Sequence, residues 1–102
     1  MTAAIFTPRA RQDLSVAARW IKKDNRAAAR ALREAVAKAA ERIGRHPRSG
    51  IVRPDLLPEP YRFVSLTGFR YVIVYNSEQR PPVIVAVLHT ARDLRHALRD
   101  VS

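Results

Sequence analysis

The chain has 102 residues, a net charge of +10 and no cysteine. This length supports one small hydrophobic core, so we expect a single domain over residues 1–102. Without cysteine the chain forms no disulfide, thiolate metal site or cysteine nucleophile. The longest unbroken apolar run, residues 83–88, is far shorter than the ~18 residues of a membrane span, which predicts a cytoplasmic protein with no membrane contact.

The positive charge is concentrated in the first half of the chain. Residues 1–50 hold 12 of the 19 Lys and Arg but only 4 of the 9 Asp and Glu. Such a charge favours an acidic or polyanionic partner, such as nucleic acid or an acidic protein segment. Arginine and alanine are both abundant, however, and a GC-rich coding sequence produces the same composition without selection for binding. Both interpretations stay open at this level.

The N-terminal half predicts a short strand and two helices. After the apolar pair at residues 5–6, Thr7 and Pro8 are typical of a helix start, because threonine caps the first turn and proline needs no donor there. Apolar residues then recur at helical spacing: Leu14, Ala17, Ala18 and Ile21. Asn25 caps a second helix, which we expect to end at Gly44 and to pair with the first as a helical hairpin. The apolar stripe of this second helix is Ala29, Leu32, Val36, Ala39 or Ala40, and Ile43.

The C-terminal half predicts three strands and a short helix. Residues 45–60 are rich in proline and must form a loop. Segments rich in β-branched and aromatic residues follow, and we expect strands over residues 61–66, 71–75 and 83–88. The last two strands lack polar alternation, so both of their faces should be covered. A short terminal helix is expected from Ala91.

Five short motifs occur along the chain: DL at 13–14, RHPRSG at 45–50, YR at 61–62, YVIVYN at 71–76 and VLHTARDL at 87–94. Together they resemble the RelE/ParE superfamily of toxins from bacterial toxin–antitoxin pairs, and most of all its ParE branch. The resemblance covers nearly the whole chain. It implies an α+β fold with an N-terminal strand, an α-helical hairpin packed on a small, curved, mostly antiparallel sheet, and a short C-terminal helix.

The resemblance also implies a function and partners. A ParE-like toxin of a type II toxin–antitoxin pair is held silent by a ParD-like antitoxin and, when free, binds DNA gyrase and blocks the resealing of cut DNA. The RelE branch keeps the fold but cuts messenger RNA in the ribosomal A site. A plain nucleic-acid-binding module is a third possibility. We expect no cofactor and no metal, since His46 and His96 have no partner at ligand spacing.

An RNA-cleaving site needs a proton acceptor, a proton donor and cations over the phosphate. The candidate residues for such a site are Arg62, Arg70, His89 and Arg92. RelE-like nucleases place a lysine cluster before and along the corresponding strand, but residues 53–59 lack it, and no tyrosine follows His89. We therefore favour the ParE-like function, in which the protein is not itself an enzyme, and keep the RelE-like endonuclease as the alternative.

The motif at residues 87–94 has a structural interpretation as well as a catalytic one. In the structural interpretation His89 ends the last strand with its ring hydrogen-bonded locally, while Arg92 and Asp93 tie the terminal helix to the sheet. In the catalytic one His89 acts as an acid or base, which its ordinary pKa allows. We favour the structural interpretation.

Partner contacts are expected on two arginine-rich helix faces and at one tryptophan. Spacings of three and four residues place each of two trios on one helical side. The trios are Arg92, Arg95 and Arg99 near the C-terminus, and Arg26, Arg30 and Arg33 along the second helix. Trp20 lies beside the apolar stripe of the first helix, so it is either a packing residue or an anchor for a partner. These residues are candidates for contact with gyrase, with gyrase-bound DNA or with the antitoxin.

Overall fold

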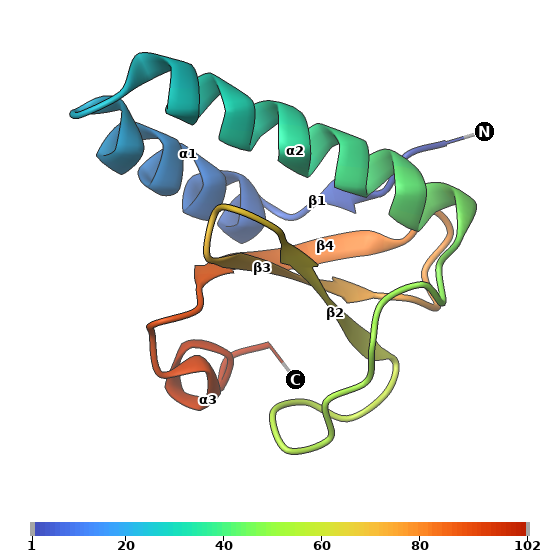
Figure 1. Ribbon diagram of the computed structural model, residues 1–102. Coiled ribbons are helices and arrows are strands. Elements are labelled where there is room, and N and C mark those ends of the chain that lie inside the picture. Colours follow the sequence, from blue (N-terminus) through green and yellow to red (C-terminus); the bar gives the residue numbers. More distant parts are fainter. Residues whose placement is uncertain (1, 102) are drawn as a thin grey trace.

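A hairpin of two helices lies across one face of a four-stranded sheet, and a short helix lies on the other side (Figure 1). The structure, a computed structural model, describes residues 2–101. Its elements in chain order are β1 (Ile5–Phe6), α1 (Pro8–Lys22), α2 (Arg26–Arg45), β2 (Tyr61–Leu66), β3 (Tyr71–Asn76), β4 (Val83–His89) and α3 (Leu94–Ala97). The predicted α+β architecture is confirmed.

The sheet has the strand order β1-β4-β3-β2, with β1 parallel to β4 and the other neighbours antiparallel. Between β3 and β4 the pairing passes from Val74 with Ala86 to Tyr75 with Ile84, so Val85 is an extra residue in β4. A bulge of this kind bends a strand and increases its twist, which contributes to the curvature of the sheet.

The two long helices begin where the sequence indicates, and they bury the faces that it indicates. The side chain of Thr7 accepts a hydrogen bond from the N–H of Ala10, and the side chain of Asn25 accepts one from Ala28. The predicted stripe of α2 is buried along its whole length: Ala29, Leu32, Val36, Ala39, Ala40 and Ile43. Within residues 2–101 none of the helices has the length and hydrophobicity of a transmembrane span.

Gly44 does not end α2, contrary to the prediction from the sequence. The helix continues through it to Arg45. A Cβ atom at Gly44 would overlap the carbonyl oxygen of Thr2 and lie 2.8 Å from the Cα of Ala3. The glycine therefore serves the close approach of the N-terminal segment to α2 rather than the end of the helix.

Both faces of the sheet are covered, as the lack of polar alternation predicted. The face toward the hairpin contributes Ile73 and Tyr75 of β3, which are fully buried. The opposite face packs against Leu57 from the long loop and against Ala97 and Leu98 from the C-terminal segment. Leu98 is fully buried, so the residue that directly follows α3 belongs to the core.

The C-terminal helix is shorter than expected. It begins at Leu94 and not at Ala91, with Asp93 as its N-cap, and ends at Ala97. Two members of the C-terminal arginine trio, Arg92 and Arg99, therefore lie outside it. The prediction that this trio forms one helical face is wrong, because the helix has a single turn.

Candidate functional site

Three of the sequence motifs meet in one hydrogen-bond cluster beyond the end of α2. The Tyr75 hydroxyl, on β3, donates to the carbonyl oxygen of Pro47 at 2.7 Å and accepts from the N–H of Gly50 at 2.9 Å. From β2, Nη1 of Arg62 donates to the carbonyl oxygen of Gly50 at 2.8 Å. The RHPRSG, YR and YVIVYN motifs thus hold the loop after α2 against the sheet, and Arg62 takes part in that framework.

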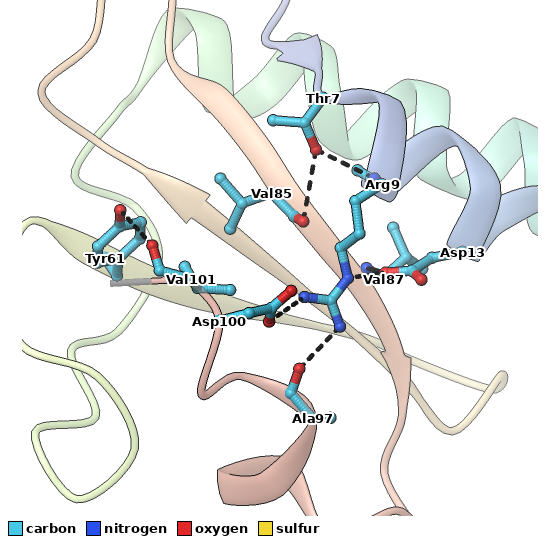
Figure 2. A network of polar contacts seen from close by, with 10 residues as sticks. Thr7, Arg9, Asp13, Tyr61, Val85, Val87, Ala97, Asp100 and Val101 are labelled. Atoms are coloured by element: carbon cyan, nitrogen blue, oxygen red, sulfur yellow. Dashed lines mark hydrogen bonds and ion pairs between the residues drawn. The ribbon is translucent and has the colours of Figure 1, made fainter.

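A second cluster joins the start of α1 to the C-terminal segment through Arg9 (Figure 2). Its Nη2 donates to the carbonyl oxygen of Ala97 at 2.8 Å, and its Nη1 lies 3.0 Å from the carboxylate of Asp100. Its Nε lies 3.2 Å from Asp13, whose Oδ2 accepts a hydrogen bond from the N–H of Val87 at 3.0 Å. The DL and VLHTARDL motifs therefore meet where α1 borders β4.

The residues expected to tie the terminal helix to the sheet were Arg92 and Asp93, and this prediction is wrong. Asp93 caps α3 by accepting a hydrogen bond from the N–H of His96 at 3.2 Å. Arg92 is exposed, and no side-chain hydrogen bond or ion pair within residues 2–101 joins it to the helix or the sheet. The spacing of Arg9 and Asp13, four residues apart on one helix, is only a weak local signal. Their partners in β4 and the C-terminal segment are 74 to 91 residues away, so no local pattern marks them.

A groove of about 410 Å³ lies between α1 and the edge of β4, and we call it the α1/β4 groove. It exists because β1 pairs with only residues 83–84 of β4, so that α1 borders the strand beyond this point. Its lining residues are Asp13, Val16, Ala17, Trp20, Tyr71, Val87, His89 and Arg92. Trp20 is 67% exposed and Val16 50% exposed, which makes them two of the few large apolar side chains left open to solvent. The groove is therefore mainly an apolar surface.

His89 ends β4 and makes the local hydrogen bond that the sequence predicted. Its Nδ1 accepts a hydrogen bond from the N–H of Ala91 at 3.0 Å. Its ring packs edge-on against Tyr71, with the ring centroids 5.1 Å apart. Burial raises the pKa of the Tyr71 phenol above its ordinary value.

Arg62 lies at the opposite end of the sheet from His89. In the register of the sheet Arg62 pairs with Tyr75 of β3, whereas His89 pairs with Tyr71. These two positions on β3 are four residues apart, which corresponds to about 13 Å along the strand. The strand pairing therefore separates Arg62 from His89.

The other candidate nuclease residues lie at the His89 end of the sheet. Arg70 stands in the turn before β3 with a φ of 56°, and its carbonyl oxygen accepts a hydrogen bond from Thr90 at 2.8 Å. Arg92 lines the α1/β4 groove together with His89. The structure thus brings Arg70, His89 and Arg92 to one end of the sheet. Arg62 is not among them, because its guanidinium is bound to the loop.

A second groove, of about 530 Å³, lies between the two long helices, and we call it the hairpin groove. Its lining residues are Ser15, Ala18, Arg19, Lys22, Arg26, Ala29, Arg30 and Arg33. The predicted trio of α2 lies here, joined by two cations of α1 that sequence reasoning did not single out. The spacing of Arg19 and Lys22 was visible, but only the packing of α1 against α2 places them opposite the trio.

Residues 4–94 match the family model for the ParE toxin of the type II toxin–antitoxin system, parDE. The chain belongs to this family. As a ParE toxin it is one half of a toxin–antitoxin pair and has a cognate antitoxin. No curated protein sequence matches the chain. The part that matches the ParE family contains α1, α2 and all four strands, and so it contains both grooves.

Proposed function

We propose that this ParE family toxin binds DNA gyrase and blocks the resealing of cut DNA, and that it acts in the cytoplasm when its ParD-like antitoxin is absent. The protein performs no catalysis of its own in this mechanism. Membership of the ParE family supports the class of toxin. The match of residues 4–94 to the ParE family is the observation that favours gyrase binding over RNA cleavage, and the separation of Arg62 from His89 removes one cation from the candidate nuclease set.

The chemistry of RNA cleavage makes that separation important. Attack by the 2′-hydroxyl requires a proton acceptor and a cation at the same phosphate. Arg62 donates to the carbonyl oxygen of Gly50 and lies about 13 Å along the sheet from the level of His89. These contacts remove Arg62 from the candidate nuclease site. His89, Arg70 and Arg92 remain at one end of the sheet, so the RelE-like endonuclease stays the alternative to be tested.

The α1/β4 groove is the surface that we propose for the contact with gyrase. Protein interfaces draw most of their binding energy from a few large side chains, with tryptophan and arginine enriched among them. Trp20 is 67% exposed and Arg92 is exposed, and both line this groove. Lys23 lies 4.7 Å from the Trp20 ring centroid, which helps to keep the indole at the surface.

The cognate antitoxin is proposed to be an acidic, partly disordered protein of the ParD type. A disordered segment that folds on binding covers a large area of a small partner, and negative charge complements a toxin with a net charge of +10. We expect a short acidic reading frame beside the one that encodes this chain. Co-purification of its product with the toxin tests this pairing, and a neighbouring frame of basic or unrelated composition would contradict it.

The decisive experiment compares gyrase and the ribosome directly. Purified toxin is added to gyrase in a supercoiling and DNA-cleavage assay, and in parallel to ribosomes programmed with messenger RNA. We expect accumulation of cleaved DNA with gyrase and intact messenger RNA on the ribosome. Cut messenger RNA together with unchanged gyrase activity would establish the nuclease alternative instead.

A further inference from the structure

The hairpin groove faces away from the sheet. All of its lining residues belong to α1 or α2. Its floor is formed by Ser15, Ala18 and Ala29, and neither alanine belongs to the core cluster between the hairpin and the sheet. In Figure 1 the sheet lies on one side of the hairpin only. The groove is therefore open to a partner without any rearrangement of the core.

The charge of the groove is entirely positive. Five of its eight lining side chains are cations: Arg19, Lys22, Arg26, Arg30 and Arg33. All five are exposed, and within residues 2–101 none of them is in an ion pair. The carboxylates nearest in sequence, Asp24 and Glu34, do not line the groove. A cluster of exposed cations without ion-pair partners among residues 2–101 favours the binding of a polyanion.

The cations form two rows along a narrow floor. On α2 the steps from Arg26 to Arg30 and from Arg30 to Arg33 are about 6 Å and about 4.5 Å at the helical rise of 1.5 Å per residue. Arg19 and Lys22 form the opposite row on α1. Each strand of duplex DNA carries one phosphate per about 3.4 Å of helix axis, so a backbone lying along the roughly 10 Å between Arg26 and Arg33 presents about three phosphates to the two rows.

The side chains that line the hairpin groove are unsuited to two other kinds of partner. Single-stranded nucleic acid is bound through aromatic side chains on which bases stack, and the hairpin groove is lined by none. An amphipathic peptide helix needs pockets for large apolar anchors, but only alanine and serine form this floor. The exposed apolar side chains of α1, Val16 and Trp20, line the other groove. The phosphate backbone of a duplex fits these observations.

We propose that the hairpin groove binds the phosphate backbone of double-stranded DNA without regard to base sequence. Contacts to phosphates position a protein on a duplex and do not read bases, which accounts for the lack of sequence preference. The choice of DNA over duplex RNA rests on the proposed function, because gyrase holds the toxin beside duplex DNA. Binding itself is measured without gyrase, so its failure is distinguishable from a failure of the gyrase proposal.

The experiment measures binding of the full chain to a labelled 20-base-pair DNA duplex by fluorescence anisotropy over a series of salt concentrations. The test variant is Arg26→Gln/Arg30→Gln/Arg33→Gln. The control is Lys38→Gln/Arg42→Gln/Arg45→Gln, which removes three exposed cations from the same helix at the same spacing but outside the groove. Circular dichroism verifies that both variants are folded.

We expect the slope of log K against log salt to fall in magnitude by about three in the groove variant, roughly one unit per lost phosphate contact. The control variant should keep the slope of the unchanged protein within about one unit. An equal loss in both variants would show an effect of net charge alone and would overturn the proposal. An unchanged slope in the groove variant would overturn it as well.

Two competitors test the identity of the bound polyanion. Unlabelled duplex DNA of a different base sequence should displace the probe with the same affinity as the labelled sequence. A 20-residue oligoglutamate should compete only at much higher concentration. Displacement by oligoglutamate at or below the concentration of DNA would assign the groove to an acidic protein segment, and preferential displacement by duplex RNA would assign it to RNA. Either result would replace the DNA proposal.

Discussion

The two grooves lie beside the same helix, α1, yet their chemistry differs sharply. The α1/β4 groove exposes Trp20 and Val16 and contains one arginine, whereas the hairpin groove contains five cations over a floor of alanine and serine. One surface suits a protein and the other a polyanion. The helix α1 thus helps to line two grooves of different chemistry, while Ala10 and Ala17 on its buried side pack in the core.

The largest effect is expected from Trp20→Ala. Loss of a central aromatic anchor typically costs about 2 kcal/mol of binding, or roughly 30-fold in affinity. The concentration of toxin that half-inhibits supercoiling should rise by that factor, while affinity for bare DNA stays the same. The matched control is Ile51→Ala, which removes a 60% exposed apolar side chain outside both grooves. Equal losses in gyrase inhibition and DNA binding would show that the two surfaces act as one.

A smaller, salt-dependent effect is expected from the triple change Arg26→Gln/Arg30→Gln/Arg33→Gln. If DNA held by gyrase lies along the hairpin groove, inhibition of supercoiling should weaken by about tenfold at low salt and by less at high salt, since screening already reduces the contribution of exposed charges. Titration of inhibition at two salt concentrations measures this. A loss independent of salt would instead indicate a direct contact with the gyrase protein.

His89→Ala should mainly affect stability. The change removes the edge-on contact with Tyr71 and the acceptor for the N–H of Ala91, which together are worth about 1–2 kcal/mol. We expect a lower midpoint in urea denaturation, and toxicity reduced only in proportion to the folded fraction. A well-folded variant that still binds gyrase but has lost all toxicity would support a catalytic role for the histidine.

The smallest effect on gyrase inhibition is expected from substitutions in the C-terminal arginine trio, and it should differ between its members. Arg92 lines the α1/β4 groove, whereas Arg95 and Arg99 do not. Arg92→Gln should weaken gyrase inhibition by about tenfold at most, as expected for one charge at an interface rim. Arg95→Gln/Arg99→Gln should change inhibition by less than about twofold, since exposed substitutions away from an interface are usually near neutral. A larger loss of inhibition in Arg95→Gln/Arg99→Gln than in Arg92→Gln would place the gyrase contact at α3 and not in the groove.

Local chemistry explains why much of the fold was predictable. Caps at Thr7 and Asn25 depend on a side chain and an N–H three residues later, and a buried helix face repeats within one turn. Such short-range patterns are visible in sequence. Gly44 shows the limit, because its role depends on the backbone of Thr2, which crosses the helix. The same residue type ends many helices, so sequence alone favoured the wrong role.

The candidate site was predictable only in part, because it depends on contacts between distant segments. Trp20 and the α2 arginines were singled out by their spacing, but their separation into two grooves follows from the packing of α1. Arg62 belongs to the short YR motif and was a candidate for phosphate binding, yet it binds the carbonyl oxygen of Gly50. A motif residue that stabilises the framework and one that contacts a partner look alike until the pairing of strands is known.

The parallel pairing of β1 with β4 has a consequence for how the toxin is made. Ile5 pairs with Val83, so β1 cannot enter the sheet until β4 has been synthesised. Bringing segments 78 residues apart together costs about 4 kcal/mol of loop-closure entropy. The sheet edge beside α1 and the Asp13–Val87 hydrogen bond form only after β4 has been synthesised. Newly made toxin therefore acquires its α1/β4 groove only after residues 83–89 have been synthesised, and a nascent chain interrupted before residue 83 has none.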